Sequence, residues 1–184
     1  MNAGDILARL QRDQREHDLR AHEDIFYLPY PSRMRHLTFH VAKYSGRLAE
    51  AASTKEMGRT IVDAFIVSLS AADVLKISFA KEFEKLTRMS DPKGLSALGR
   101  ALDTGGTADN VADWYFRQLA LIGGRMAKAC ESLDHMEPFP YRDTLSGAVI
   151  DLARACLVAA RRVDLDLEAA VRRHWEEIEA QRIL

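Results

Sequence analysis

Four side chains that could take part in chemistry follow one another along a predicted helix. His36, His40, Tyr44 and Arg47 are spaced by three or four residues, so on an α-helix they share one face, and the stripe leads toward Asp63. Two imidazoles and one carboxylate can form an open metal site. His36, His40 and Asp63 are therefore one candidate ligand set. The same histidines could instead cap a helix or line a polar groove beneath the N-terminal helix.

Carboxylates near this stripe offer a second chemistry. Glu50 and Glu56 could contribute to an oxygen-rich cage, which is what hard divalent cations such as Mg²⁺ require. They could equally lie on a solvated face. Asp63, Glu50 and His40 are the candidate catalytic residues, and we expect His174 to lie at the rim of such a site rather than to act as an acid or base.

Two further groups of residues could bind a nucleotide. A basic cluster could hold a phosphate without a metal, and an aromatic group could stack on a base. The plainer alternatives are a solvated helix face for the first and core or dimer contacts for the second. No P-loop, GxGxxG, Ser/His/Asp order or zinc-ligand spacing is present. The basic residues are Arg33, Arg35, Lys43 and Arg47, and the aromatic residues are Phe26, Tyr27, Tyr30, Trp114, Tyr115 and Phe116.

The overall composition excludes several classes of partner. The 184 residues include 26 Lys and Arg against 27 Asp and Glu, so no global field attracts nucleic acid or an anionic membrane. The N-terminal segment is charged where a signal peptide needs an apolar core, and no apolar run approaches the length of a membrane span. Cys130 and Cys156 lack metal-ligand spacing, which fits buried reduced thiols. We expect a cytoplasmic protein.

The periodicity of apolar residues predicts an all-α chain, because they recur every three to four residues and never alternate over the length of a strand. Helices are expected over 5–23, 33–52, 55–75 with continuation to about 88, 108–133 and 141–163. A last helix should open at Asp164 or Asp166. Two prolines should end the first helix, and Ser32 could cap the second. We expect one domain, 1–184, with a break at 103–106.

Two segments of the chain read as versions of one unit. Residues 46–49 (GRLA) match 124–127 (GRMA), and residues 61–63 (IVD) match 149–151 (VID). We interpret this as an internal repeat, with an N-terminal helix over 1–31, repeat one at about 32–102 and repeat two at about 107–184. Two like hairpins would pack about a pseudo-twofold axis into a helical bundle. A further self-association face is expected.

The repeated segments resemble a known enzyme superfamily. The tail at 163–182 is similar to the C-terminal "DLEEAV…K…R" helix of the MazG-like all-α nucleotide pyrophosphohydrolases. Residues 62–64 and 150–152 resemble the aspartate of that family's E-x-x-D helix, and residues 44–50 resemble its E-x-G-E-L-A-E helix. The resemblance covers about 36–89 and 114–184. It makes the chain similar in plan to the dimeric dUTPases of the superfamily.

The resemblance implies a metal site that this chain has largely lost. In active relatives four carboxylates hold Mg²⁺, which neutralises the charge of the phosphates during hydrolysis. Only the aspartate remains in either copy, and one carboxylate cannot cage a magnesium ion. The four matching positions hold Tyr44, Arg47, Thr60 and Asp63 in the first copy and Ile122, Arg125, Ala148 and Asp151 in the second.

In both copies an arginine replaces a glutamate while the aspartate is kept. A guanidinium would occupy the place of the cation, because its planar fork suits a carboxylate and a lone aspartate on an apolar helix would be costly. We therefore predict two structural ion pairs between adjacent helices, Arg47 with Asp63 and Arg125 with Asp151. Such pairs specify helix register more than they add net stability.

Two functions follow from these features. The first is a catalytically silent or altered binding or scaffold module with a nucleotide-sized groove, which needs no cofactor and could bind a nucleotide, a protein partner or itself. The alternative is a nucleoside triphosphate pyrophosphohydrolase that uses Mg²⁺ or Mn²⁺. Its metal site would be rebuilt from His36, His40, Asp63 and Glu50 or completed by a partner subunit.

Overall fold

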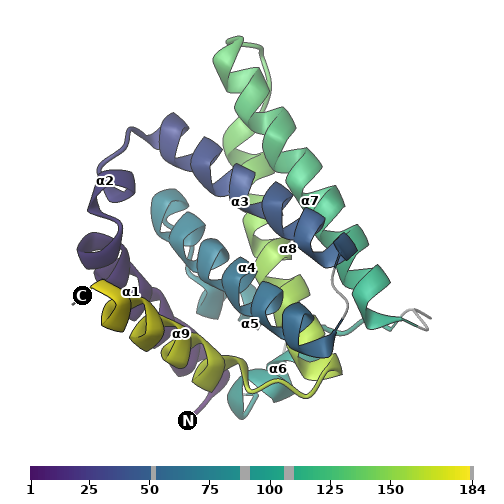
Figure 1. Cartoon of the computed structure of the whole chain (residues 1–184). Helices are drawn as coiled ribbons and strands as arrows, with labels where there is room; N and C mark the ends of the chain where they lie inside the picture. Colours follow the sequence, from purple (N-terminus) through teal and green to yellow (C-terminus); the bar gives the residue numbers. More distant parts are fainter. Residues whose placement is uncertain (51–52, 88–91, 106–109, 183–184) are drawn as a thin grey trace.

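The computed structural model describes residues 1–50, 53–87, 92–105 and 110–182. Over these residues it is helical without a β-strand, apart from one isolated bridge between Asn2 and Lys93. The predicted all-α class is confirmed (Figure 1). The helices are α1 (Ala3–Ala21), α2 (Glu23–Phe26), α3 (Tyr30–Glu50), α4 (Thr54–Leu75), α5 (Phe79–Thr87), α6 (Gly94–Leu102), α7 (Val111–Asp134), α8 (Tyr141–Arg162) and α9 (Leu167–Arg182).

Side-chain caps fix the starts of two helices that position the candidate site. The Ser53 side chain accepts a hydrogen bond from the Glu56 backbone N–H at the start of α4. At the start of α9 the carboxylate of Asp166 accepts one from the Ala169 backbone N–H. Of the two aspartates considered for this helix, Asp166 is the cap, whereas Asp164 lies in the preceding turn with a φ of 55°. These caps satisfy N–H groups that have no partner inside the helix.

The expected start of α3 at residue 33 with Ser32 as its cap is wrong. The helix begins at Tyr30, so that both Pro31 and Ser32 lie in its first turn. Proline is tolerated there because the first N–H groups of a helix have no intrahelical acceptor. The Arg33 N–H already donates to the Pro29 carbonyl at 3.0 Å. The first helix also ends earlier than expected, at Ala21, and the short α2 precedes the prolines.

The helix expected over 55–75 corresponds to α4, and its expected continuation beyond Leu75 is also wrong. Lys76 adopts a left-handed conformation with a φ of 59°, which ends α4. The link to α5 is held from outside by Gln11 of α1. Its amide donates to the Ile77 carbonyl at 2.8 Å, and its carbonyl accepts from the Phe79 N–H at 3.0 Å. The break turns α5 toward α1, where its aromatic side chains are buried.

The two longest hairpins form the centre of the molecule. α3 packs on α4 and α7, and α8 packs on α4 and α7, so these four helices enclose one apolar core (Figure 1). α4 and α8 expose almost no apolar surface because other helices cover them, α1 and α9 on α4 and α6 on α8. Cys130 and Cys156 are buried free thiols in this core. Within the described ranges, no helix combines the length and apolarity that crossing a bilayer requires.

α6, which was not expected from the sequence, approaches α8 very closely. A Cβ atom added to Gly99 would lie 2.5 Å from the backbone carbonyl oxygen of Leu157 and 3.2 Å from the Cβ of Arg161. The contact therefore depends on the missing side chain of this glycine. This close contact holds α6 against α8.

Candidate functional site

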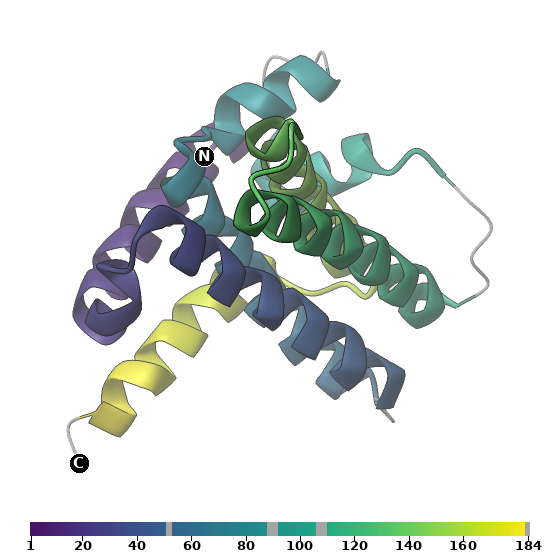
Figure 2. The same cartoon turned by 90° about the horizontal axis from the view of Figure 1, so that it is seen from above.

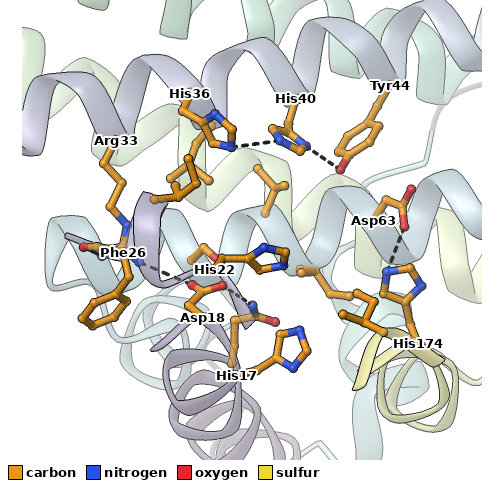
Figure 3. A pocket seen from close by; sticks show the side chains of 17 residues that line it. His17, Asp18, His22, Phe26, Arg33, His36, His40, Tyr44, Asp63 and His174 are labelled. Carbon is orange, nitrogen blue, oxygen red and sulfur yellow. Dashed lines mark hydrogen bonds and ion pairs between the residues drawn. The ribbon is translucent and has the colours of Figure 1, made fainter. Parts of the chain in front are cut away.

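A cavity of about 250 Å³ lies between α1, α2, α3, α4 and α9 (Figure 3). It contains five of the six histidines of the chain, and we call it the histidine cavity. Apolar side chains form much of the rest of its wall. Two aspartates and one arginine also line it. Its histidines are His17, His22, His36, His40 and His174, and its remaining lining residues are Gln14, Asp18, Ile25, Phe26, Arg33, Leu37, Tyr44, Asp63, Ile66, Val67, Ser70 and Ile178.

Helical periodicity explains how each wall is built. Side chains three or four residues apart share one face of a helix, and each wall uses one such face. Figure 2 shows α1, α3 and α9 as three separate rods, with α9 close to α1. The faces are Gln14, His17 and Asp18 on α1; Arg33, His36, Leu37, His40 and Tyr44 on α3; Asp63, Ile66, Val67 and Ser70 on α4; and His174 and Ile178 on α9.

The α3 wall carries a chain of hydrogen-bonded rings. The Nε2 atoms of His36 and His40 lie 3.1 Å apart, and His40 Nδ1 lies 2.9 Å from the Tyr44 hydroxyl. Burial lowers the pKa of both histidines, helped by the nearby charge of Lys43, and that of His40 falls to about 4. Both imidazoles are therefore neutral near pH 7, and each offers one donor and one acceptor.

Both predicted Arg–Asp pairs are present between adjacent helices. Arg47 Nη1 lies 2.6 Å from Asp63 Oδ2, and Arg125 Nη2 lies 2.7 Å from Asp151 Oδ2. Their surroundings differ. Asp63 is 16% exposed and its other oxygen lies 3.5 Å from His174 Nε2, whereas Asp151 is 38% exposed and lies outside the histidine cavity. Only the first pair is thus part of the candidate site.

A buried polar network closes the end of the cavity near α1. The Trp175 indole N–H donates to the Gln14 carbonyl at 2.8 Å, and the Gln14 amide donates to Asp18 at 2.8 Å. Asp18 also accepts from Arg33 at 3.3 Å, and the Arg33 guanidinium lies 4.6 Å from the centre of the Phe26 ring. These bonds join α1, α3 and α9 and satisfy polar groups that would be costly if buried alone.

His17 is the polar group of this wall that the fold leaves unsatisfied. The ring is 2% exposed, and neither of its nitrogens has a hydrogen-bond partner. The nearest carboxylate oxygen, from Glu179, lies 3.6 Å from Nδ1, which is too long for a hydrogen bond. Burial lowers the pKa of His17, so the ring is neutral. Figure 3 shows it at the edge of the cavity near His22 and Asp18.

A polar groove continues from the histidine cavity. It has a volume of about 550 Å³ and shares Asp63, His174 and Ile178 with the cavity. The candidate carboxylates Glu50 and Glu56 lie here, beside two arginines. The Glu56 side chain also accepts a hydrogen bond from the Ser53 hydroxyl at 3.0 Å, in addition to the backbone bond at the start of α4. The further residues of the groove are Arg47, Arg59, Thr60, Glu177 and Gln181.

The three candidate metal ligands His36, His40 and Asp63 are not gathered around one point. Within the described part of the chain, no group of three or more His, Cys, Asp or Glu side chains could hold a metal ion. His36 and His40 are adjacent, but Asp63 is engaged by Arg47 and His174 instead. His36 and His40 therefore contact each other, while Asp63 belongs to a separate contact with Arg47 and His174.

The predicted basic and aromatic clusters are dispersed. Arg33 pairs with Asp18, Arg35 with Asp134, and Arg47 with Asp63, while Lys43 lies 3.2 Å from His40 Nδ1. Of the six aromatic residues, Phe26 lines the cavity, and Tyr115 is fully buried in the bundle. Tyr27 is 67% exposed. A phosphate site formed by the four basic residues together does not exist in this arrangement.

No family model, curated protein or solved structure matches the chain. Its function must be argued from the cavity. A polar groove beneath the N-terminal helix was one alternative from the sequence, but the α1 residues that line it were not identified. A signal exists there: the buried apolar face of Ile6 and Leu10 continues as Gln14, His17 and Asp18 at the same spacing. Polar residues on the buried face of a helix indicate either partners or a ligand.

Proposed function

We propose that the chain is a binding module for a nucleoside phosphate, built on a degenerate MazG-like plan of two helical repeats related by a pseudo-twofold. The base would occupy the histidine cavity and the phosphates the adjoining polar groove. The observation that carries this proposal is the unsatisfied His17 ring in a cavity lined mainly by imidazoles and apolar side chains.

The chemistry of the cavity favours a flat heteroaromatic group with polar edges. Neutral imidazoles can donate or accept, so they can match both kinds of edge atom on a base. Ile66 and Val67 supply apolar contact surface on α4. Small-molecule sites typically combine an apolar wall with a few fixed polar groups that set orientation. A base bound in this cavity would give His17 the hydrogen bond that the fold does not supply.

The groove favours an anion at its outer end. Arg47 is 48% exposed and gives Asp63 one hydrogen bond, so further guanidinium donors remain to bind phosphate oxygens. Arg59 also lines this groove. With arginine at the position of a metal-ligand glutamate, phosphate recognition would proceed without Mg²⁺ and without hydrolysis.

The test compares two matched variants. Asp63→Asn and Asp151→Asn each weaken one Arg–Asp pair of similar geometry, but only Asp63 lines the cavity. Calorimetry with ribo- and deoxynucleoside mono-, di- and triphosphates in the presence of a chelator should detect binding to the wild type. Asp63→Asn should weaken it at least tenfold, and Asp151→Asn should leave it unchanged.

Two results would contradict the proposal. Absence of binding across the panel by the folded wild type would exclude a nucleoside phosphate. Release of pyrophosphate or phosphate with Mg²⁺ or Mn²⁺, lost in Asp63→Asn and kept in Asp151→Asn, would establish the alternative pyrophosphohydrolase with a rebuilt metal site.

A further inference from the structure

We propose that His36 and His40 form a two-imidazole binding site for a transition-metal ion such as Zn²⁺, Ni²⁺ or Cu²⁺, with its open coordination positions facing the histidine cavity. This inference does not depend on the proposed nucleotide function. It also differs from a carboxylate site for Mg²⁺, because imidazole nitrogen selects transition metals, whereas Mg²⁺ prefers oxygen.

The positions of the two nitrogens fit one shared ion. Zinc binds imidazole nitrogen at about 2.0–2.1 Å in tetrahedral geometry, which places two such nitrogens roughly 3.3 Å apart. The Nε2 atoms of His36 and His40 are already 3.1 Å apart on adjacent turns of α3. Helical His pairs with this spacing occur in zinc sites for the same geometric reason. The ion would replace the hydrogen bond between the two Nε2 atoms, so the proton between them must move to His36 Nδ1 and both lone pairs must turn toward the ion.

Tyr44 orients one of the two ligands. A metal on Nε2 requires the proton of a neutral imidazole to reside on Nδ1, where it must be donated to an acceptor. The Tyr44 hydroxyl lies 2.9 Å from His40 Nδ1, and the tyrosine is 5% exposed, so this acceptor is held in place. Figure 3 shows the three rings in a row along α3, with both imidazoles on the cavity side.

The charges around the pair limit its strength. Lys43 Nζ lies 3.2 Å from His40 Nδ1, and because an ammonium group can only donate, it must move away before that nitrogen can carry the proton. Its charge would also oppose a cation. Its side chain is exposed and can turn into solvent. The metal would keep its remaining positions for water or for a donor in the cavity, as open metal sites do. We therefore expect an exchangeable ion rather than a permanently bound structural one.

The experiment uses the full chain after chelator treatment, with Cu²⁺ as the probe. The Irving–Williams order predicts that Cu²⁺ binds most tightly of the divalent ions. Titration followed by calorimetry should give one site per chain, and electron paramagnetic resonance should show hyperfine splitting from two nitrogens. His36→Gln and His40→Gln should each weaken binding at least tenfold. Excess Mg²⁺ should not compete, whereas Ni²⁺ and Zn²⁺ should.

The chain offers two matched controls for the variants. His135 is the histidine outside the cavity, and His174 lies inside it with its Nε2 3.5 Å from an Asp63 oxygen. His135→Gln and His174→Gln should leave the Cu²⁺ affinity unchanged. An equal loss in either control, or unchanged affinity in both α3 variants, would overturn the proposal. A wild-type spectrum without two-nitrogen splitting would also overturn it, even if the variants failed to fold.

Discussion

Replacing Gly99 by alanine tests the close approach of α6 to α8. The added Cβ would lie 2.5 Å from the Leu157 carbonyl oxygen and 3.1 Å from its carbonyl carbon. Carbon and oxygen atoms in ordinary contact are well beyond 3 Å apart, so α6 must move away from α8. Overpacking of this kind costs about 1–3 kcal/mol, and alanine's better helix propensity offsets at most about 1 kcal/mol of it. We expect a net loss of about 1–2 kcal/mol.

Gly147 provides the matched control for this substitution. It also lies inside a long helix, α8, but a Cβ there meets nothing within 4 Å. Gly147→Ala should stabilise the protein by about 0.5–1 kcal/mol through the unfolded chain and helix propensity. For a domain of this size each kcal/mol moves the midpoint by about 2–4 °C. Thermal unfolding followed by circular dichroism should shift the two midpoints in opposite directions; similar midpoints for both variants would refute the packing argument.

The remaining predictions concern buried polar groups. Burial lowers the pKa of His40 to about 4, so the folded protein binds fewer protons than the unfolded chain between about pH 6.5 and 4. Stability should therefore fall as the pH drops through this window, by about 3 kcal/mol. Urea denaturation of His40→Gln should show a flatter acid limb. Arg162 holds the pKa of Asp103 below its usual value through two hydrogen bonds of 2.9 and 2.7 Å. Asp103→Asn should cost about 1–3 kcal/mol near pH 7, and the difference from wild type should vanish in strong acid, where the wild-type carboxylate is also protonated. Gln14→Leu should destabilise by about 2–4 kcal/mol because it leaves the Trp175 N–H without an acceptor, and Trp175→Phe should partly rescue it in the double variant.

Much of the helix assignment could be predicted from short-range patterns in the sequence. α4 and α8 were predictable because their apolar residues are dense and continuous, and the Arg47 and Asp63 pair followed from the charges within one hairpin. The break at Lys76 was not predictable, because the sequence around it remains amphipathic. The left-handed turn there is held by Gln11 from α1, and no local pattern of the α4–α5 segment contains that residue.

The candidate site was only half predictable for a related reason. His36, His40 and Asp63 could be identified from their spacing as candidate site residues. In the structure Asp63 does not join the two histidines, in part because His174 approaches it from α9. His17 becomes significant only when α1 packs beside α4 and α9. Periodicity shows which face of a helix is buried but not which distant helix packs on it, so the sequence offered a polar groove beneath the N-terminal helix as an alternative without identifying the walls from α1 and α9.

The histidine cavity also has a consequence for the timing of synthesis. Its walls include Gln14 and His17 near one end of the chain and His174 and Ile178 near the other. Ribosomes add about 5–20 residues per second, so the residues of α9 are synthesised roughly 10–30 s after those of α1. During that interval the polar face of α1 lacks the Trp175 partner of Gln14. A ligand of this cavity could therefore bind only after translation has passed α9, and it could not assist the folding of the nascent helices before then.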